Sequence, residues 1–343
     1  MDNMTLDARM RNIVVMGASA GGVEALTVLF RHLPPDLPAA ILVVLHIPAH
    51  TPSQLHRILA RLTPMPVVVA EDGQALEAGT IYVASADRHL MLDEYGIRIT
   101  RGPKECRVRP AIDVLFRSAA IVYGPRVTGA RLSGALDDGT AGLWAIKDHG
   151  GRALVQEPAQ AMYASMPESA IRHVDVDFVG PLETLAQQIA AMVKIPIESP
   201  VKVSVEKRHI IENQIATAGN GIRAGVMDLG KVSRYTCPDC HGVLVQIEEG
   251  SVIRFRCHTG HAFSLKTLIA EVNAAIDSGL WDTLRALEER MMLLRQMADI
   301  SEKAGVPQGA ERCRRLADDA ENRLKPLREL VLDADFFGHD PET

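Results

Sequence analysis

The sequence predicts an α/β protein whose doubly wound, mostly parallel sheet is followed by a compact β-like module and an α-helical hairpin. Short β-rich runs alternate with segments of helical spacing through residues 12–195, which is typical of a parallel sheet covered by helices on both faces. Three cysteines then crowd into one short β-like segment, and two apolar stripes of helical spacing follow it. These three observations predict, in chain order, an α/β domain, a cysteine-containing β-like module and a helical hairpin.

Residues 1–195 supply the predicted α/β domain. Its strands are expected, in chain order, at IVVMG, AILVVL, PVVVA, TIYVA, HLMLD with GIRIT, VTGARLSG and ALVQ. Segments of helical spacing such as GGVEALTVLFRHL and PSQLHRILARL separate them. The turn residues EYG between HLMLD and GIRIT predict a hairpin, which is an antiparallel excursion within the domain.

The rest of the chain is expected to form three parts. Residues 196–232 are polar and rich in turn residues, so we expect a linker with a short helix near residues 205–216. Residues 233–263 are compact and β-like. Residues 264–335 have helical spacing, and Ser264 is a plausible N-cap for the first helix.

Two apolar stripes predict paired helices at the end of the chain. The first recurs at intervals of four and three residues, at Leu280, Leu284, Leu287, Met291 and Leu294. The turn AGVPQG separates it from a stripe between Cys313 and Val331, in which Pro326 should kink or end the helix. The stripes could close an intramolecular hairpin, or they could join two chains as a homodimer.

Composition narrows the class of protein. A chain of 343 residues with 47% hydrophobic residues can form about two domains with sizeable cores. A net charge of −6 provides no general reason to expect nucleic-acid binding. The N-terminus lacks the apolar core of a signal peptide, and no run of about 18 apolar residues occurs, so we expect a cytoplasmic protein without direct membrane insertion.

A glycine-rich turn carries the first reactive side chain. In IVVMGASAGGVEAL, Ser19 lies between a strand pattern and a helix pattern, where a tight turn leaves backbone N–H groups free to stabilise negative charge. Such a serine could be a nucleophile, but it could also bind phosphate or cap the helix. A dinucleotide-binding loop would require an acidic residue about twenty residues further on. The second strand ends instead at His46.

Two more reactive groups follow strands. His46 comes directly after AILVVL, and His50 competes with it for the role of a base within the same loop. Asp137 and Asp138 follow the strand VTGARLSG and precede a helix, where either could orient a histidine or cap that helix. Because the carboxyl ends of parallel strands share one edge of the sheet, we expect these groups to lie together.

Six blocks in order give this region a resemblance to a known family. They are GASAGG, LHIP, EDGQALEAGTIYVASADRHL, RPAIDVLFRSAA, LSGALDDGTAGL and VQEPAQAMYASMPESAI. The chain resembles the chemotaxis-type protein-glutamate methylesterases over roughly residues 12–193. The resemblance implies a catalytic Ser19 nucleophile, a His46 base and an Asp138 acid, because the family's acid immediately precedes the glycine that is here Gly139.

The resemblance also implies an activity and its partners. It implies hydrolysis of methyl esters on glutamate side chains of methyl-accepting chemotaxis receptors or a related methylated signalling protein, with release of methanol and deamidation of some glutamines. No cofactor is expected for catalysis. Backbone N–H groups between Ser19 and Gly22 are the expected oxyanion donors, with residues 134–137 as a second source. The alternative is a signalling adaptor that retains the esterase fold, has weak or no catalysis and acts through its C-terminal module.

Two features distinguish this chain from the receptor-coupled branch of the family. Ala20 stands where that branch commonly has threonine, and Gly134, Ala135 and Leu136 stand where it often has glycine, methionine and glycine. The esterase pattern also begins near residue 12, so the resemblance is to stand-alone forms without a receiver domain. The C-terminal region is similar to an extension found on such forms.

The cysteines after residue 233 predict a metal site. CPDC places Cys237 and Cys240 at zinc-knuckle spacing, and RFRCHTGH adds Cys257 and His261 after two short predicted strands. These four residues are the expected ligands of a structural zinc ion in a zinc-ribbon-like module, and His241 or His258 could replace one of them. The alternative is a redox-active Cys-x-x-Cys pair. Complete ligation by protein groups would leave no open position for a reacting water.

Overall fold

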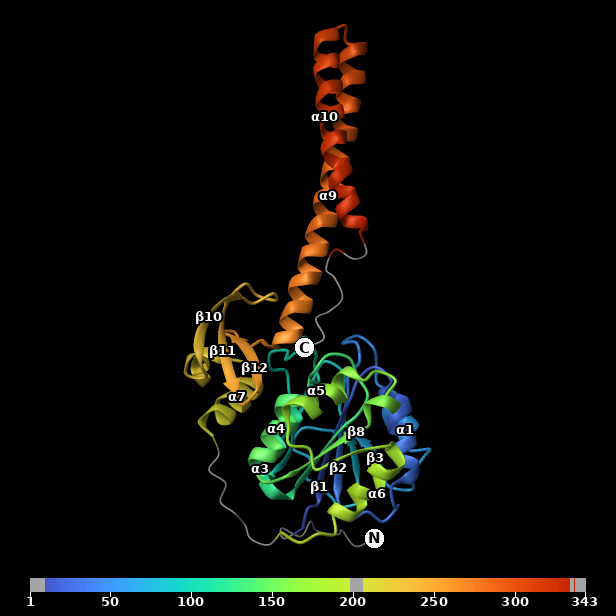
Figure 1. Ribbon diagram of the computed structural model, residues 1–343, viewed down its shortest axis with the longest axis vertical. Coiled ribbons are helices and arrows are strands. Elements are labelled where there is room, and N and C mark those ends of the chain that lie inside the picture. The colour runs from blue at the N-terminus through green and yellow to red at the C-terminus, as the bar shows by residue number, and fades with distance from the viewer. Residues whose placement is uncertain (1–9, 198–205, 334–335, 337–343) are drawn as a thin grey trace. The chain divides into compact units, whose positions relative to one another are not determined.

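The computed structural model describes residues 10–197, 206–333 and 336. It contains two compact units, residues 1–267 and residues 268–343, and each has its own internal contacts (Figure 1). Among the described residues, no helix combines the length and the apolar character that crossing a membrane would require.

The first unit contains a seven-stranded parallel sheet with the strand order β3-β4-β2-β1-β7-β8-β9. Its strands are β1 (Ile13–Ala18), β2 (Ala40–Leu45), β3 (Val67–Val69), β4 (Ile81–Val83), β7 (Val127–Arg131), β8 (Arg152–Gln156) and β9 (Phe178–Gly180). The predicted parallel sheet is therefore confirmed. Only the short β9 was missed, because three residues carry almost no periodicity.

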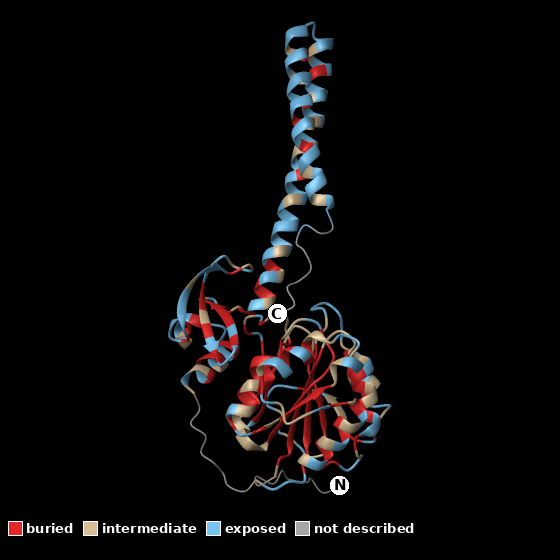
Figure 2. Ribbon diagram, viewed as in Figure 1, coloured by how far each residue is buried: buried red, intermediate tan, exposed pale blue. Residues whose placement is uncertain are grey.

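Helices cover both faces of the sheet. The helices are α1 (Gly22–His32), α2 (Leu55–Leu59), α3 (Ile112–Tyr123), α4 (Thr140–Asp148), α5 (Ser165–His173) and α6 (Leu182–Met192). One core lies under α1, α2 and α6, and the other lies under α3, α4 and α5 (Figure 1). Alternate residues of β1 enter the two cores, since Val14 and Met16 face the first while Ile13 and Val15 face the second. Figure 2 shows this burial concentrated on the strands.

A separate hairpin interrupts the α/β alternation. Strands β5 (His89–Asp93) and β6 (Gly96–Thr100) pair antiparallel, with Asp93 opposite Gly96. The Asp93 carboxylate accepts hydrogen bonds from the amides of Tyr95 and Gly96, as an Asx turn does. The hairpin predicted around EYG is therefore confirmed.

A four-stranded antiparallel sheet completes the first unit. Its strands are β10 (Lys231–Thr236), β11 (Val243–Glu249), β12 (Val252–Cys257) and β13 (Ala262–Ser264). We call this sheet and its turns, residues 231–264, the ribbon. The stretch expected as a linker contains α7 (Lys207–Ala218) and α8 (Gly221–Ala224), and residues 198–205 lie outside the described residues.

Helix α7 packs on the α/β domain. The hydroxyl of Thr100 donates to the carbonyl of Ala216 at 2.8 Å. A side chain at Gly102 would place its Cβ 2.2 Å from the same carbonyl oxygen, so only glycine permits this approach. Short 3₁₀ helices at Gly124–Arg126, Pro158–Gln160 and Val226–Asp228 connect the longer elements.

Two long helices form the end of the chain, α9 (Leu265–Lys303) and α10 (Pro307–Leu332). At the start of α9, the Ser264 hydroxyl accepts a hydrogen bond from the amide of Thr267 at 3.0 Å, which confirms the predicted N-cap. The predicted hairpin is also confirmed, with Leu284 buried on α9 and Ala317 buried on α10. Pro326 was expected to kink or end its helix, and it does not end it, because α10 continues through it for six residues to Leu332.

Candidate active site and metal site

Three neighbouring strands bring Ser19, His46 and the Asp137–Asp138 pair to one edge of the sheet. β1 lies between β2 and β7, and the three strands run parallel. Ser19 follows β1, His46 follows β2, and the aspartates follow β7. This is also the position where the strand order reverses, which is where open α/β sheets form their ligand crevices.

His46 and Asp138 form a direct pair. His46 Nε2 lies 2.7 Å from Asp138 Oδ2, and the two side chains are 12% and 3% exposed. Asp138 also accepts hydrogen bonds from the first amides of α3, at 2.7 Å from Ile112 and 3.1 Å from Asp113. Burial alone would raise the pKa of Asp138, but the hydrogen bonds from His46 and the two amides outweigh it and lower that pKa.

The two neighbouring aspartates have different partners. Asp137 accepts a hydrogen bond from the hydroxyl of Ser264 at 2.6 Å and another from Thr267 at 3.3 Å. Burial raises its pKa, although those hydrogen bonds oppose the shift. The structure therefore pairs His46 with the second aspartate and directs the first toward the start of α9. His50, the other histidine of the loop after β2, is exposed.

The turn around Ser19 depends on close backbone contacts. Gly21 has a φ of 70°, and an added Cβ would lie 2.7 Å from Met162 and 2.8 Å from the Ser133 hydroxyl. On the other side, a Cβ at Gly134 would lie 2.9 Å from Ser19 Cβ. Ser19 is therefore held between two segments that tolerate only glycine at their points of contact.

Within the described residues, no hydrogen bond joins the Ser19 hydroxyl to His46. His46 Nε2 faces Asp138, so Nδ1 is the ring nitrogen left for Ser19. Contacts between a nucleophile and its base are often loose without substrate and tighten when substrate binds.

Backbone donors lie next to Ser19. The amides of Ser19 and Gly22 are already bonded, to the carbonyls of Ser133 and Ser19 respectively. In the described part of the chain, the amides of Ala20 and Gly21 have no protein acceptor, so they can donate to an oxyanion. The Gly134 amide is taken by the carbonyl of Tyr163 at 3.0 Å, which removes one donor from the second expected source.

A cavity of about 320 Å³ opens beside His46. Its lining includes three cationic side chains, Lys104, Arg107 and Arg109, and one carboxylate, Asp87. Arg109 binds Asp87 through two nitrogens at 2.6 Å and 3.0 Å, and these hydrogen bonds lower the pKa of Asp87. Arg109 begins the RPAIDVLFRSAA block, whereas the segment that holds Lys104 and Arg107 has no periodic or motif signal of its own.

Two further ionisable side chains, Asp113 of the RPAIDVLFRSAA block and Arg131, lie near Asp138. Asp113 is buried, and burial together with the nearby Asp138 charge raises its pKa well above the usual value. Arg131 at the end of β7 is also fully buried and donates to the Thr140 hydroxyl at 2.8 Å. Strand-like patterning around Arg131 predicted its position, but not that its charge would be buried.

The four predicted metal ligands lie together in the ribbon. One ligand atom from each of Cys237, Cys240, Cys257 and His261 lies within 4.8 Å of the others. Two turns hold them, one closed by the Cys237 amide on Gly242 at 2.7 Å and the other by the Cys257 amide on His261 at 2.9 Å. The described residues contain no disulfide at these cysteines. His241 and His258 are not members of this cluster.

The chemistry of this cluster fits a divalent cation. Hydrogen bonds within it lower the pKa of Cys257, raise that of Cys237 and raise that of His261 to about 9. A cation bound by these four side chains would replace their protons. Three thiolates and one imidazole at tetrahedral spacing are a typical zinc ligand set.

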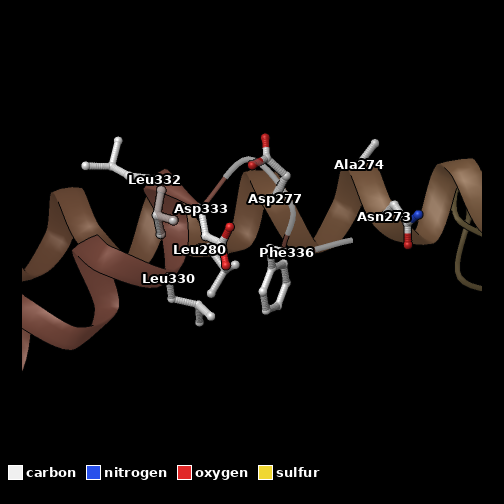
Figure 3. A pocket seen from close by; sticks show the side chains of 9 residues that line it. Asn273, Ala274, Asp277, Leu280, Leu330, Leu332, Asp333 and Phe336 are labelled. Atoms are coloured by element: carbon white, nitrogen blue, oxygen red, sulfur yellow. The ribbon is translucent and has the colours of Figure 1, made fainter. Parts of the chain in front are cut away.

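A cavity of about 400 Å³ lies within the second unit, between α9 and the end of α10 (Figure 3). Leu280, Leu330 and Phe336 line it together with Asp277 and Asp333. Among the described residues that line it there is no serine, cysteine or histidine, so these residues offer no nucleophile and base.

A serine, a histidine and an aspartate at neighbouring strand ends of an α/β sheet form an arrangement found in serine hydrolases. Residues 14–189 match the CheB methylesterase family, and the chain belongs to that family. The predicted family resemblance is therefore confirmed. The matched residues end before the ribbon begins.

Individual relatives agree with this assignment. Protein-glutamate methylesterase/protein-glutamine glutaminase 2 of Methanosarcina mazei is 35% identical over 193 residues, which are 54% of this chain and 53% of the relative. A Leptospira interrogans relative is 38% identical over 175 residues, covering 51% of this chain and 91% of that protein. The crystal structure of the Thermotoga maritima CheB methylesterase catalytic domain is 31% identical, with a TM-score of 0.51 over 53% of this chain and 98% of that domain. The chain spans about half the length of the Methanosarcina relative.

Proposed function

We propose that this chain is a serine hydrolase that removes methyl esters from glutamate side chains of methyl-accepting chemoreceptors or a related methylated signalling protein. Deamidation of glutamine side chains is a second reaction of the same site. The observation that carries the proposal is the 2.7 Å pair of His46 and Asp138 on the strand end beside Ser19. The names of the relatives support the same two reactions.

The roles of the three residues follow from this geometry. His46 Nδ1 takes the proton of the Ser19 hydroxyl while Ser19 Oγ attacks the ester carbonyl, and Asp138 stabilises the imidazolium through Nε2–H. The carbonyl oxygen becomes an oxyanion that the amides of Ala20 and Gly21 stabilise. Collapse of this intermediate breaks the bond to the methoxy group, which leaves as methanol with the proton from His46.

Water then completes the cycle. It gives a proton to His46 as it attacks the acyl-enzyme, and Ser19 recovers that proton when the glutamate carboxylate leaves. In deamidation, ammonia leaves in place of methanol. None of these steps requires a cofactor.

The charge of the cavity supports an acidic protein substrate. Lys104, Arg107 and Arg109 outnumber the single carboxylate of Asp87 in its lining. A cleft of one charge sign concentrates substrates of the opposite sign. A receptor segment rich in glutamate, some of it methylated, has the complementary charge.

Methanol release from methylated chemoreceptor tests the proposal. We expect Ser19→Ala to lower the rate on the order of a millionfold, since it removes the nucleophile. Ser53→Ala is the matched control, because the described contacts of its hydroxyl are limited to the amide of Leu55 at 3.4 Å. A serine-reactive phosphonate should label the wild type and the control at Ser19 but not Ser19→Ala. Equal methanol release by all three proteins would contradict the esterase and leave the adaptor function.

We also propose that Cys237, Cys240, Cys257 and His261 bind one structural zinc ion. Zinc would cross-link the two turns of the ribbon, and its closed ligand set leaves no position for substrate. Metal analysis should find one equivalent of zinc that Cys237→Ser loses and Cys313→Ser keeps, since Cys313 is on α10. Cobalt-substituted wild-type protein should show thiolate-to-metal charge-transfer absorption, and Cys237→Ser treated with cobalt should not. Unchanged metal content in Cys237→Ser would overturn this assignment.

A further inference from the structure

A buried acidic side chain joins the ribbon to the helix that holds Asp138. Glu105 is 2% exposed and lies 2.8 Å from Arg117 on α3 and 2.9 Å from Arg256 on β12. Burial alone would raise the pKa of Glu105, but the charges of the two arginines outweigh it and lower that pKa. Glu105 is therefore ionised, and it ties an α/β helix to a ribbon strand. Arg256 directly precedes Cys257, one of the four clustered ligands.

Helix α7 closes the same network. Glu212 is fully buried and binds Arg256 at 2.7 Å and Arg254 at 2.7 Å. Buried ions are tolerated only where partners hold them in good geometry, so each of these side chains restricts the positions of the others. The ribbon thus cannot shift against α3 without separating buried charges.

Backbone pairing adds a second connection. The Cys106 amide donates to the Ala262 carbonyl at 2.8 Å, and the Ala262 amide donates to the Lys104 carbonyl at 3.2 Å. Residues 104–106 therefore extend the ribbon as an additional parallel edge next to β13. This places Glu105 at the junction of the ribbon and the loop that lines the active-site cavity.

The loop beyond Glu105 is strained and points toward the site. Cys106 and Arg107 have φ values of 48° and 64°, and the Val108 amide closes the turn on Glu105 at 3.0 Å. Residues other than glycine adopt positive φ values only where the surrounding structure imposes them, and backbone strain of this kind clusters at functional sites. Arg107 and Val108 then line the cavity together with His46.

The ion network also reaches the reacting groups through α3. Arg117 lies in the same helix as Ile112 and Asp113, whose amides hold Asp138 at 2.7 Å and 3.1 Å. A helix moves as a rigid body over this length, so a displacement at Arg117 also displaces those two amides. The orientation of Asp138 therefore depends on contacts that the ribbon supplies.

We propose that Glu105 is a positioning residue through which the metal-loaded ribbon holds Asp138 and the cavity wall in their reactive geometry. The metal supports catalysis without contacting substrate, and loss of the metal inactivates the esterase. This inference rests on the proposed function, and it assigns the ribbon a part in the active site itself.

Glu105→Gln tests the positioning role, because glutamine preserves the shape but removes the charge that holds both arginines. We expect kcat for methanol release to fall about a hundredfold with little change in KM, as a misplacement of about 1 Å does. The low-field proton resonance of the His46 Nε2–H bond to Asp138 should disappear. Glu248→Gln, an exposed glutamate on β11 of the same sheet, is the matched control and should retain both properties.

Removal of the metal provides the second perturbation, and it leaves every side chain of the network in place chemically. Chelation should reduce kcat and remove the same proton resonance, and restoring zinc should recover both. The effects of chelation and Glu105→Gln should not add, because both act on one linkage. If Glu105→Gln fails to fold, chelation still tests the inference.

Two results would overturn the inference. One is a Glu105→Gln protein with a lower unfolding temperature but unchanged kcat and proton resonance, which would make the contact purely structural. The other is metal-free protein with full activity and an intact resonance. Absence of esterase activity in the metal-loaded wild type would instead reject the proposed function, while the proton resonance would still report on positioning.

Discussion

Replacing Asp138 by asparagine should abolish most of the activity while leaving the protein folded. Asp138 Oδ2 accepts from His46 Nε2 and the Ile112 amide, and Oδ1 accepts from the Asp113 amide. When the amide oxygen of asparagine takes the Oδ2 position, it still accepts hydrogen bonds from His46 Nε2 and the Ile112 amide. Its NH₂ group then faces the Asp113 amide, and that unsatisfied contact costs about 1–3 kcal/mol of stability.

The loss of rate follows from the lost charge. In the transition state His46 is an imidazolium, with Nε2 2.7 Å from the Asp138 oxygen. At an effective dielectric constant of about 20, a charge pair at that distance is worth about 6 kcal/mol. Since about 1.4 kcal/mol corresponds to a factor of ten, kcat should fall on the order of ten-thousandfold.

Asp137→Asn is the matched comparison. Its amide oxygen can still accept from Ser264 and Thr267, so kcat should stay within about threefold of wild type. The assay is methanol release from methylated receptor, with circular dichroism to verify folding. Folded Asp138→Asn protein within about tenfold of wild-type kcat would refute the reasoning, and so would an equal loss in Asp137→Asn.

Three further outcomes are expected. Gly134→Ala should lower kcat about a hundredfold, because the new Cβ would come within 1.9 Å of Met166 Sδ and displace the segment beside the nucleophile; methanol release measures this. Burial lowers the pKa of His89, so its stabilising contribution is complete above the unfolded value of 6.5 and is lost as pH falls through the folded pKa. Melting temperatures between about pH 7.5 and about pH 5 should therefore decline, and decline less in His89→Gln. Leu284→Ala should destabilise the hairpin by about 2–5 kcal/mol in denaturant unfolding, whereas exposed Leu293→Ala should change it by about 0.5 kcal/mol or less.

Local patterns were sufficient to predict most of the fold. The first strand, Ile13–Ala18, is an apolar run followed by glycines, and it is completely buried in the sheet. The turn between Asp93 and Gly96 was predicted because Asx turns are local. Pro326 is the instructive exception, since a proline costs one backbone hydrogen bond that tertiary packing of a long helix can offset.

The stretch read as a linker shows where local patterns fail. KRHIIENQIATA forms α7, in agreement with the short helix expected near residues 205–216, but its pattern did not indicate that Glu212 within it is fully buried. Its burial depends on Arg254 and Arg256, which are 42 and 44 residues further along the chain. A charged residue in a polar segment is predicted to be solvent-exposed, because the sequence does not show which distant opposite charges will lie beside that residue.

By itself the sequence determined the strand ends that carry Ser19, His46 and the aspartate pair, and the spacing of the clustered cysteines and histidine. Both depend on short-range geometry, in which strand periodicity and turn residues specify where a side chain lies. Only the tertiary structure decided that α3 supplies two of the hydrogen bonds to Asp138 and that Glu105 joins the ribbon to the site. Those contacts join segments distant in the chain, and their energies depend on burial and orientation that no local pattern encodes.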